Sequence, residues 1–163
     1  MRPYYVQMAL PALTVIVLDQ ISKYLIVHMI PFFGSITVID GFFALVHIRN
    51  RGMAFGLMNR PDPGFMFYLL VVASLVAIVL LICWAIRLKD QDWRITIGLS
   101  LILGGAIGNM TDRLRLKEVI DFLDFHVGTY HWPSFNIADS AVTVGAIWLA
   151  INLLKAQGAK RKA

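Results

Sequence analysis

The stretch Phe65-Met-Phe-Tyr-Leu-Leu-Val-Val-Ala-Ser-Leu-Val-Ala-Ile-Val-Leu-Leu-Ile-Cys-Trp-Ala-Ile86 decides the fold class, because it is almost entirely apolar and contains no charged residue. About 20 consecutive apolar residues are enough for a helix to span the hydrocarbon core of a bilayer. Three further stretches approach or reach this length, so we expect spans at about residues 4–29, 65–86, 95–114 and 135–154. The sequence therefore predicts a mainly α-helical integral membrane protein, with residues 1–163 forming a single domain of four transmembrane helices.

The composition supports the same class. The chain has 163 residues, of which 58% are hydrophobic and 15% charged, whereas soluble domains carry about a quarter charged residues. The net charge of +5 raises the question of nucleic acid, but the basic residues form no stripe with interleaved aromatic residues, so we expect no nucleic-acid partner. The single Cys83 excludes an internal disulfide.

The basic residues predict the orientation in the membrane. Positive charge is dense at Arg2, in the connector of residues 87–94, and in the tail at Lys155 and residues 160–162. Short loops rich in lysine and arginine stay in the cytoplasm. We therefore expect both termini to be cytoplasmic and the two longer connections to lie at the outer face.

The first outer connection, at about residues 36–56, predicts a small β-sheet. Ile36-Thr-Val-Ile39 and Phe42-Phe-Ala-Leu-Val-His-Ile48 flank Asp40-Gly41, which is a typical hairpin turn. Asn50-Arg-Gly-Met-Ala-Phe-Gly56 follows as a polar loop containing glycine. We expect this sheet to lie on the outer membrane surface.

Two aspartates at the outer ends of apolar stretches are the candidate catalytic residues: Asp121 in Val-Ile-Asp-Phe and Asp139 in Phe-Asn-Ile-Ala-Asp-Ser. A carboxylate at membrane depth costs a few kcal/mol, so its retention suggests a use. The chain after the third span can run back toward the fourth, which would bring Asp121 close to Asp139. Two carboxylates that lie close together share one proton, as in the aspartic proteases that activate water.

A structural alternative exists for part of this pattern. Asn136 lies three residues before Asp139 and shares its helix face, so Asn136 or Ser134 can simply cap the helix. Asp139 would then be stabilised by the helix N-terminus. This alternative accounts for one of the two acids but not for Asp121.

Polar residues also occur inside the first span. Asp19 and Lys23 are one helical turn apart, which predicts a mutually neutralising pair with a structural, site-supporting role. A catalytic Lys23 would need a neutral amine, and the neighbouring carboxylate favours the charged form.

The third span ends in a polar cluster. Gly104 and Gly108 form a small-xxx-small pattern that permits close helix packing. Asn109 and Arg113 are four residues apart and share a helix face, beside Asp112. Polar residues can occur here simply because a helix end meets water. Alternatively, Arg113 donates hydrogen bonds to a peptide carbonyl.

The sequence does not predict a metal site. Asp121, Asp124, His126 and His131 offer ligand atoms, but there is no pair of histidines at helical spacing and no cysteine ligand. We therefore expect neither a metal nor an organic cofactor.

Five blocks in the same order resemble the lipoprotein signal peptidase (signal peptidase II) family of bacterial membrane aspartyl peptidases. The blocks are Leu18-Asp-Gln-Ile-Ser-Lys23, Asn50-Arg-Gly-Met-Ala-Phe55, Gly104-Gly-Ala-Ile-Gly-Asn-Met-Thr-Asp-Arg113, Val119-Ile-Asp-Phe122 and Phe135-Asn-Ile-Ala-Asp-Ser140. Arg51 and Met53 depart from the Thr and Ala that the family often has in the second block.

The resemblance implies removal of signal peptides from diacylglyceryl-modified prolipoproteins, by cleavage before the lipidated cysteine. It implies an Asp121–Asp139 dyad with an activated water, leaving open which aspartate is the base. The residues it implies for substrate binding or support are Asn50, Gly52, Asn109, Asp112, Arg113, Asn136 and Ala138, with Asp19 and Lys23. The expected partners are lipidated prolipoproteins and membrane lipids. We expect a monomer in the bacterial inner (cytoplasmic) membrane, with its active site at the outer face.

Three alternatives remain at this point. A four-span transporter would need an unpaired acid near the bilayer midplane, whereas Asp19 has Lys23 as a partner. An intramembrane aspartyl protease of the presenilin type would carry a Gly-x-Gly-Asp motif, which this chain lacks. A passive assembly factor would tolerate the loss of both aspartates.

Overall fold

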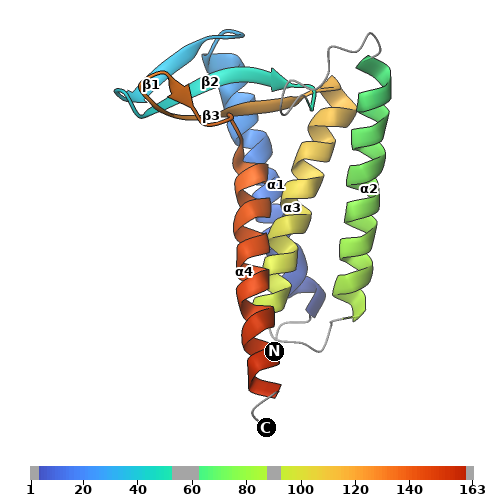
Figure 1. Cartoon of the computed structure of the whole chain (residues 1–163). Coiled ribbons are helices and arrows are strands. Elements are labelled where there is room, and N and C mark those ends of the chain that lie inside the picture. Colours follow the sequence, from blue (N-terminus) through green and yellow to red (C-terminus); the bar gives the residue numbers. More distant parts are fainter. Residues whose placement is uncertain (1–3, 53–62, 88–92, 161–163) are drawn as a thin grey trace.

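The computed structural model describes residues 4–52, 63–87 and 93–160. Within them lie four long helices, α1 (Tyr4–Met29), α2 (Pro63–Arg87), α3 (Trp93–Leu116) and α4 (Ile137–Lys160). All four are long and apolar enough to cross a membrane. The helices run alongside one another, with the described ends of α1 and α4 at Tyr4 and Lys160 both away from the sheet (Figure 1). The prediction of a four-helix membrane protein is confirmed.

The helix bounds differ from the expected spans mainly in the last helix. α1 has the expected bounds, and α2 and α3 are each longer by one or two residues at either end. The fourth span was expected at about 135–154, but α4 begins at Ile137 and continues to Lys160. The extension arises because Lys, Ala and Gln are good helix formers, so the helix persists after the apolar stretch ends.

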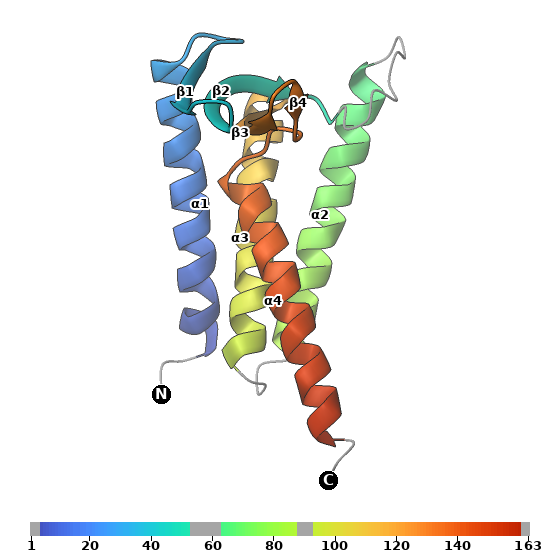
Figure 2. The same cartoon turned by 60° about the vertical axis from the view of Figure 1, so that its left-hand side comes forward.

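Helix α3 lies at the centre of the bundle and packs against α1, α2 and α4 (Figure 2). In its spanning stretch 67% of the residues are buried, whereas the share in α2 is 6%. Glycines make this close packing possible. A Cβ atom at Gly104 would lie 2.7 Å from the Ala12 carbonyl oxygen of α1, and one at Gly105 would overlap the Ala138 carbonyl oxygen of α4. The expected role of the glycine pattern in helix packing therefore extends from Gly104 to the neighbouring Gly105.

We expect Gly105→Ala to lower the free energy of unfolding by about 1–3 kcal/mol, because the added methyl group forces α3 and α4 apart. Besides Ala138, the methyl group would meet Val142 Cγ2 at 2.8 Å. Thermal unfolding in detergent measures the effect. The matched control is Ala77→Val, which adds bulk to an exposed position of α2. Equal stabilities of the two variants would contradict the packing argument.

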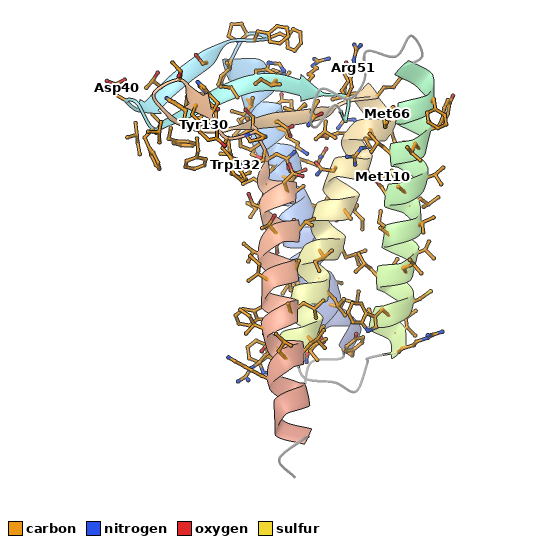
Figure 3. All side chains as sticks on the ribbon, in the orientation of Figure 1. Asp40, Arg51, Met66, Met110, Tyr130 and Trp132 are labelled. Atoms are coloured by element: carbon orange, nitrogen blue, oxygen red, sulfur yellow. The ribbon has the colours of Figure 1, made fainter. Side chains whose placement is uncertain are left out.

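A four-stranded antiparallel sheet lies across one end of the bundle (Figure 1). Its strands are β1 (Ser35–Ile39), β2 (Phe43–Asn50), β3 (Val119–Val127) and β4 (Tyr130–His131), in the order β1-β2-β3-β4. The predicted hairpin around Asp40-Gly41 is confirmed, and Gly41 takes the positive φ of 68° that its turn requires. Asp40 marks the outer tip of this hairpin (Figure 3).

The sheet is larger than the expected segment at residues 36–56, since β3 and β4 come from the connection between α3 and α4. Strand β3 does not show the alternation typical of a half-buried strand, because residues on both of its faces are buried. Ile26 of α1 and Ile30, which directly follows that helix, pack with Ile120 and Phe122 of β3 in one buried cluster. This cluster attaches the central strand, which carries Asp121, to the top of the helices.

Candidate active site

Asp121 lies on β3 and is 3% exposed. Both of its carboxylate oxygens accept a hydrogen bond from an asparagine. Asn50 Nδ2 donates to Oδ2 at 3.0 Å, and Asn136 Nδ2 donates to Oδ1 at 2.8 Å. The carboxylate is therefore held between the end of β2 and the beginning of α4.

Asp139 lies in the first turn of α4 and is half-buried. Its Oδ1 accepts a hydrogen bond from Asn109 Nδ2 at 2.8 Å. Its Oδ2 accepts one from the backbone N–H of Asn136 at 3.2 Å, while the backbone N–H of Asp139 donates to Asn136 Oδ1 at 2.9 Å. This reciprocal arrangement is a capping box, so Asn136 does cap α4, as the structural alternative for Asn136 and Asp139 proposed.

The same Asn136 that caps α4 also binds Asp121, so one fully buried residue contacts both carboxylates. Its Nδ2 atom also lies 3.1 Å from Asn109 Oδ1 and 3.2 Å from the Ile120 carbonyl oxygen. A helix cap does not require these further contacts. They connect β3, α3 and α4 at a single side chain, directly between the two candidate catalytic groups.

Beneath this cluster lies the predicted pair of Asp19 and Lys23, with Lys23 Nζ 2.8 Å from Asp19 Oδ2. Lys23 Nζ also lies 2.7 Å from Asp112 Oδ2 and donates to Asn109 Oδ1 at 3.0 Å. Asp19 Oδ1 accepts a hydrogen bond from the backbone N–H of Ala138 at 2.9 Å. The lysine thus orients Asn109, which in turn binds Asp139.

Gln20 belongs to this buried network, although the sequence argument did not select it. Its Nε2 atom donates to Asp19 Oδ2 at 3.1 Å, to Asp112 Oδ1 at 3.0 Å and to the Gly108 carbonyl oxygen at 3.3 Å. One sequence signal could have identified Gln20: it lies between Asp19 and Lys23 in a spanning helix, where an amide side chain also needs hydrogen-bond partners.

Arg113 faces α2 and is half-buried, and its Nη1 atom donates to Ser74 Oγ at 3.4 Å. The negative charges of Asp139, Asp112 and Asp121 all act on its guanidinium. The structure therefore places the expected arginine within electrostatic reach of both candidate catalytic aspartates.

The end of β2 shapes the outer side of the site. The backbone N–H of Gly52 donates to Asn50 Oδ1 at 2.8 Å, which leaves Asn50 Nδ2 free to reach Asp121. Gly52 has a φ of 84°, and a Cβ atom there would overlap Leu70, so only glycine fits. Arg51, which departs from the family pattern, pairs with Glu118 at 2.6 Å and lies near the top of α2 (Figure 3). Met53 lies outside the described residues.

Burial, with a contribution from the charge of Asp139, raises the pKa of Asp121 to about 6, although hydrogen bonds from Asn50 and Asn136 act to lower it. The structure thus couples the two acids electrostatically. A carboxyl group with a pKa near neutrality is suited to general acid–base chemistry, because both of its protonation states are accessible.

This shift predicts a pH dependence of stability. The folded pKa of Asp121 is about 6 and its ordinary value is 3.8, so between these values the unfolded chain releases a proton that the folded protein retains. The contribution of Asp121 to stability is therefore largest below pH 3.8 and falls by up to about 3 kcal/mol as the pH rises through about 6. Thermal unfolding across this range should show a weaker decrease for Asp121→Asn. An equally steep decrease in the variant would contradict the assignment to Asp121.

Comparisons with known proteins agree with this architecture. The family model for signal peptidase (SPase) II matches residues 11–155. The chain is 45% identical over 155 residues to the lipoprotein signal peptidase of Oleidesulfovibrio alaskensis, a match covering 95% of this chain and 99% of that protein. It is 42% identical over 163 residues to the lipoprotein signal peptidase of Geobacter sulfurreducens, covering 100% of this chain and 99% of that protein.

The fold also matches a solved structure described as a bacterial membrane enzyme. The TM-score is 0.78 at 33% sequence identity, over 93% of this chain and 89% of that one. Sequence and fold thus agree over nearly the whole length, including the helix ends and strands that carry the buried polar network. This multi-pass membrane protein therefore belongs to the signal peptidase II family of peptidases.

Proposed function

We propose that the protein is a membrane aspartyl endopeptidase that removes signal peptides from diacylglyceryl-modified prolipoproteins, cleaving just before the lipidated cysteine. The observation that carries the proposal is the bridge made by Asn136, which binds Asp121 through its side chain and Asp139 through its backbone. One buried residue thus brings the two carboxyl groups to the same place, and in the proposed mechanism they share one proton, as in aspartic proteases.

In this mechanism the ionised carboxyl group of the pair removes a proton from a water molecule, which attacks the scissile carbonyl carbon. The protonated carboxyl group donates its proton to the carbonyl oxygen, giving a neutral tetrahedral intermediate. The intermediate then collapses and the C–N bond breaks: the proton taken from water passes to the leaving nitrogen, and a hydroxyl proton of the intermediate returns to the carboxylate that had donated one. Because the two carboxyl groups share one proton in this mechanism, either Asp121 or Asp139 can begin as the base.

The surrounding polar residues hold the pair in position. Asn50 binds Asp121, Asn109 binds Asp139, and the Gly52 turn orients Asn50. Behind them, Lys23 with Asp19 and Asp112 forms a charged network that is almost completely buried. Rotation of either carboxylate would break a hydrogen bond to at least one of these residues, so the network restricts the pair to one geometry.

Arg113 and the sheet supply substrate-binding functions. The Arg113 guanidinium has donors suited to a peptide carbonyl, and the extended strands offer a surface for an extended segment of substrate. Asp139 is half-buried, so the dyad remains reachable from outside. Ala138 is fully buried, and its backbone N–H donates to Asp19, which connects the first turn of α4 to α1.

The proposed location is the bacterial inner (cytoplasmic) membrane, with both termini in the cytoplasm and the active site at the outer face. The sheet and the first turn of α4, which carry Asp121 and Asp139, lie at one end of the bundle, while Tyr4 of α1 and Lys160 of α4 lie at the other (Figure 1). The lipid chains of a substrate can stay in the bilayer, against the apolar side chains that α1 and α2 expose. Both acids come from one chain, so a monomer is sufficient.

Cleavage of a diacylglyceryl-modified prolipoprotein in detergent tests the proposal. We expect the purified protein to release a signal peptide and leave a product that begins at the lipidated cysteine, as identified by mass spectrometry. The matched substrate control is the same prolipoprotein without the diacylglyceryl group, which should remain uncut. Absence of cleavage by a folded protein would contradict the proposal, as would cleavage at other positions.

A further inference from the structure

A second group of polar side chains lies on the sheet, apart from the residues that hold the dyad. Asp124 and His126 are alternate residues of β3, so their side chains leave the strand on the same face. His131 of β4 is the direct partner of His126 in the antiparallel pairing. The hairpin between them turns at Gly128, which has a positive φ of 60°. A short, regular hairpin therefore brings three potential metal ligands together.

The three side chains present their ligand atoms to one another. His131 Nδ1 lies 2.9 Å from Asp124 Oδ2, and His126 Nδ1 lies 3.3 Å from the same oxygen. The two imidazole rings are stacked, with their centroids 4.7 Å apart. One ligand atom from each residue lies within 4.8 Å of the others. Two ligands at about 2.0–2.2 Å from a tetrahedral zinc ion are separated by about 3.4 Å, so this group is of the right size.

Among the described residues, one of these ligand atoms makes no hydrogen bond. The contact between Asp124 and His131 has good geometry and accounts for two of the three side chains. The Nδ1 atom of His126 is buried and has no hydrogen-bond partner among the residues that the structure describes, although it faces the carboxylate. A buried polar atom without a partner is costly, and a bound cation would satisfy it.

The group also has an open side. Asp124, His126 and His131 line a cavity of about 600 Å³, whose wall includes Trp132 and Ser134. Figure 3 shows Tyr130 and Trp132, which flank His131, on the part of the sheet beside the top of α4. Three protein ligands with a fourth position open to water or an exogenous ligand is a common zinc coordination.

We propose that Asp124, His126 and His131 form a binding site for a divalent transition-metal ion of the zinc type. Two imidazoles and one carboxylate favour zinc and its neighbours in the periodic table over magnesium or calcium, which prefer sites made wholly of oxygen. The sequence predicts no metal site, because it contains no pair of histidines at helical spacing and no cysteine ligand, and its candidate ligands included Asp121. In the structure the ligands are on a hairpin, and Asp121 is not among them.

The ion would link β3 to β4 at the end of the strand that carries Asp121. The ion would therefore stabilise the sheet, and it takes no part in the proposed peptidase reaction. The site stands independently of the proposed function, since it concerns different residues and its test does not use proteolysis.

Metal titration of the full-length protein in detergent, without a polyhistidine tag, tests the site. We expect chelator-treated protein to bind one Co²⁺ per chain with the intense visible absorption of tetrahedral cobalt, and Zn²⁺ to displace it. Loss of an outer-shell partner alone costs about 10–100-fold in metal affinity, so loss of a ligand should cost at least about tenfold. His126→Gln and His131→Gln should each show such a loss.

The matched control is His28→Gln, an exposed histidine at the end of α1, which should bind cobalt as the unchanged protein does. Thermal unfolding without metal establishes that each variant is folded. His131 is 54% exposed, so that variant should remain folded even if His126→Gln does not. Added Zn²⁺ should raise the unfolding temperature of the unchanged protein but not that of His131→Gln. Cobalt binding without a tetrahedral spectrum, or equal affinity in a folded His131→Gln, would overturn the proposal.

Discussion

Asp121→Asn and Asp139→Asn should each lower the rate of prolipoprotein cleavage by about 10³-fold or more, because either change removes the base or the acid from the pair. An amide cannot accept a proton from water, and its N–H₂ group is not an effective acid. The two single variants and the double variant should be similarly inactive, because the two groups act as a unit. Single-turnover cleavage of the lipidated substrate provides the measurement.

The control for both variants is Asp40→Asn, which makes the same chemical change at an exposed residue of the β1–β2 turn. This variant should cleave at the normal rate. Thermal unfolding should show that Asp121→Asn and Asp139→Asn remain folded, so that the loss reports chemistry. Near-normal turnover in either dyad variant would refute the aspartyl mechanism and favour a passive role for the two acids.

Lys23→Met should lower the free energy of unfolding by about 3–5 kcal/mol, because it leaves buried carboxylates without their cation. Lys23 is 2% exposed, and both Asp19 and Asp112 lie within 2.8 Å of its Nζ atom. The change should also lower activity, since Lys23 orients Asn109, which binds Asp139. Thermal and denaturant unfolding in detergent measure the stability, and the cleavage assay measures the activity.

Two further variants test whether loss of the Lys23 charge causes the decrease in stability. Lys155→Met removes a lysine from an exposed position of α4 and should leave the stability unchanged. Adding Asp112→Asn to Lys23→Met removes one of the two uncompensated carboxylates and should recover part of the lost stability. If the double variant were less stable than Lys23→Met alone, a hydrogen-bonding role of Asp112, such as its contact with the Ile120 N–H, would outweigh its charge.

The sequence predicted those elements whose signals are local. The four spans follow from apolar length alone, and the β1–β2 hairpin follows from Asp40-Gly41 between two β-prone stretches. Strand β3 was missed because it pairs with β2, about 75 residues earlier in the chain, and is covered on both faces. Its pairing partner cannot be read from a local pattern.

The contacts in the candidate site also divide into local ones, which the sequence predicted, and long-range ones, which it did not. Asn136 with Asp139, and Asp19 with Lys23, are three or four residues apart on one helix, and both contacts occur in the structure. The contacts of Asp121 with Asn50 and Asn136 span 71 and 15 residues, and they depend on the register of β3 against β2.

The sequence by itself therefore determined the membrane class, the four spans, the first hairpin and the helix-local polar pairs, because hydrophobic length and helical spacing act over short distances. Only the tertiary structure decided that Asn136 bridges Asp121 and Asp139, that Gln20 and Asp112 join Lys23, and that Asp124 meets His126 and His131. These contacts depend on strand pairing and helix packing between distant segments. Their geometry is set by the mostly buried strand β3 and the central helix α3, whose partners no local sequence pattern specifies.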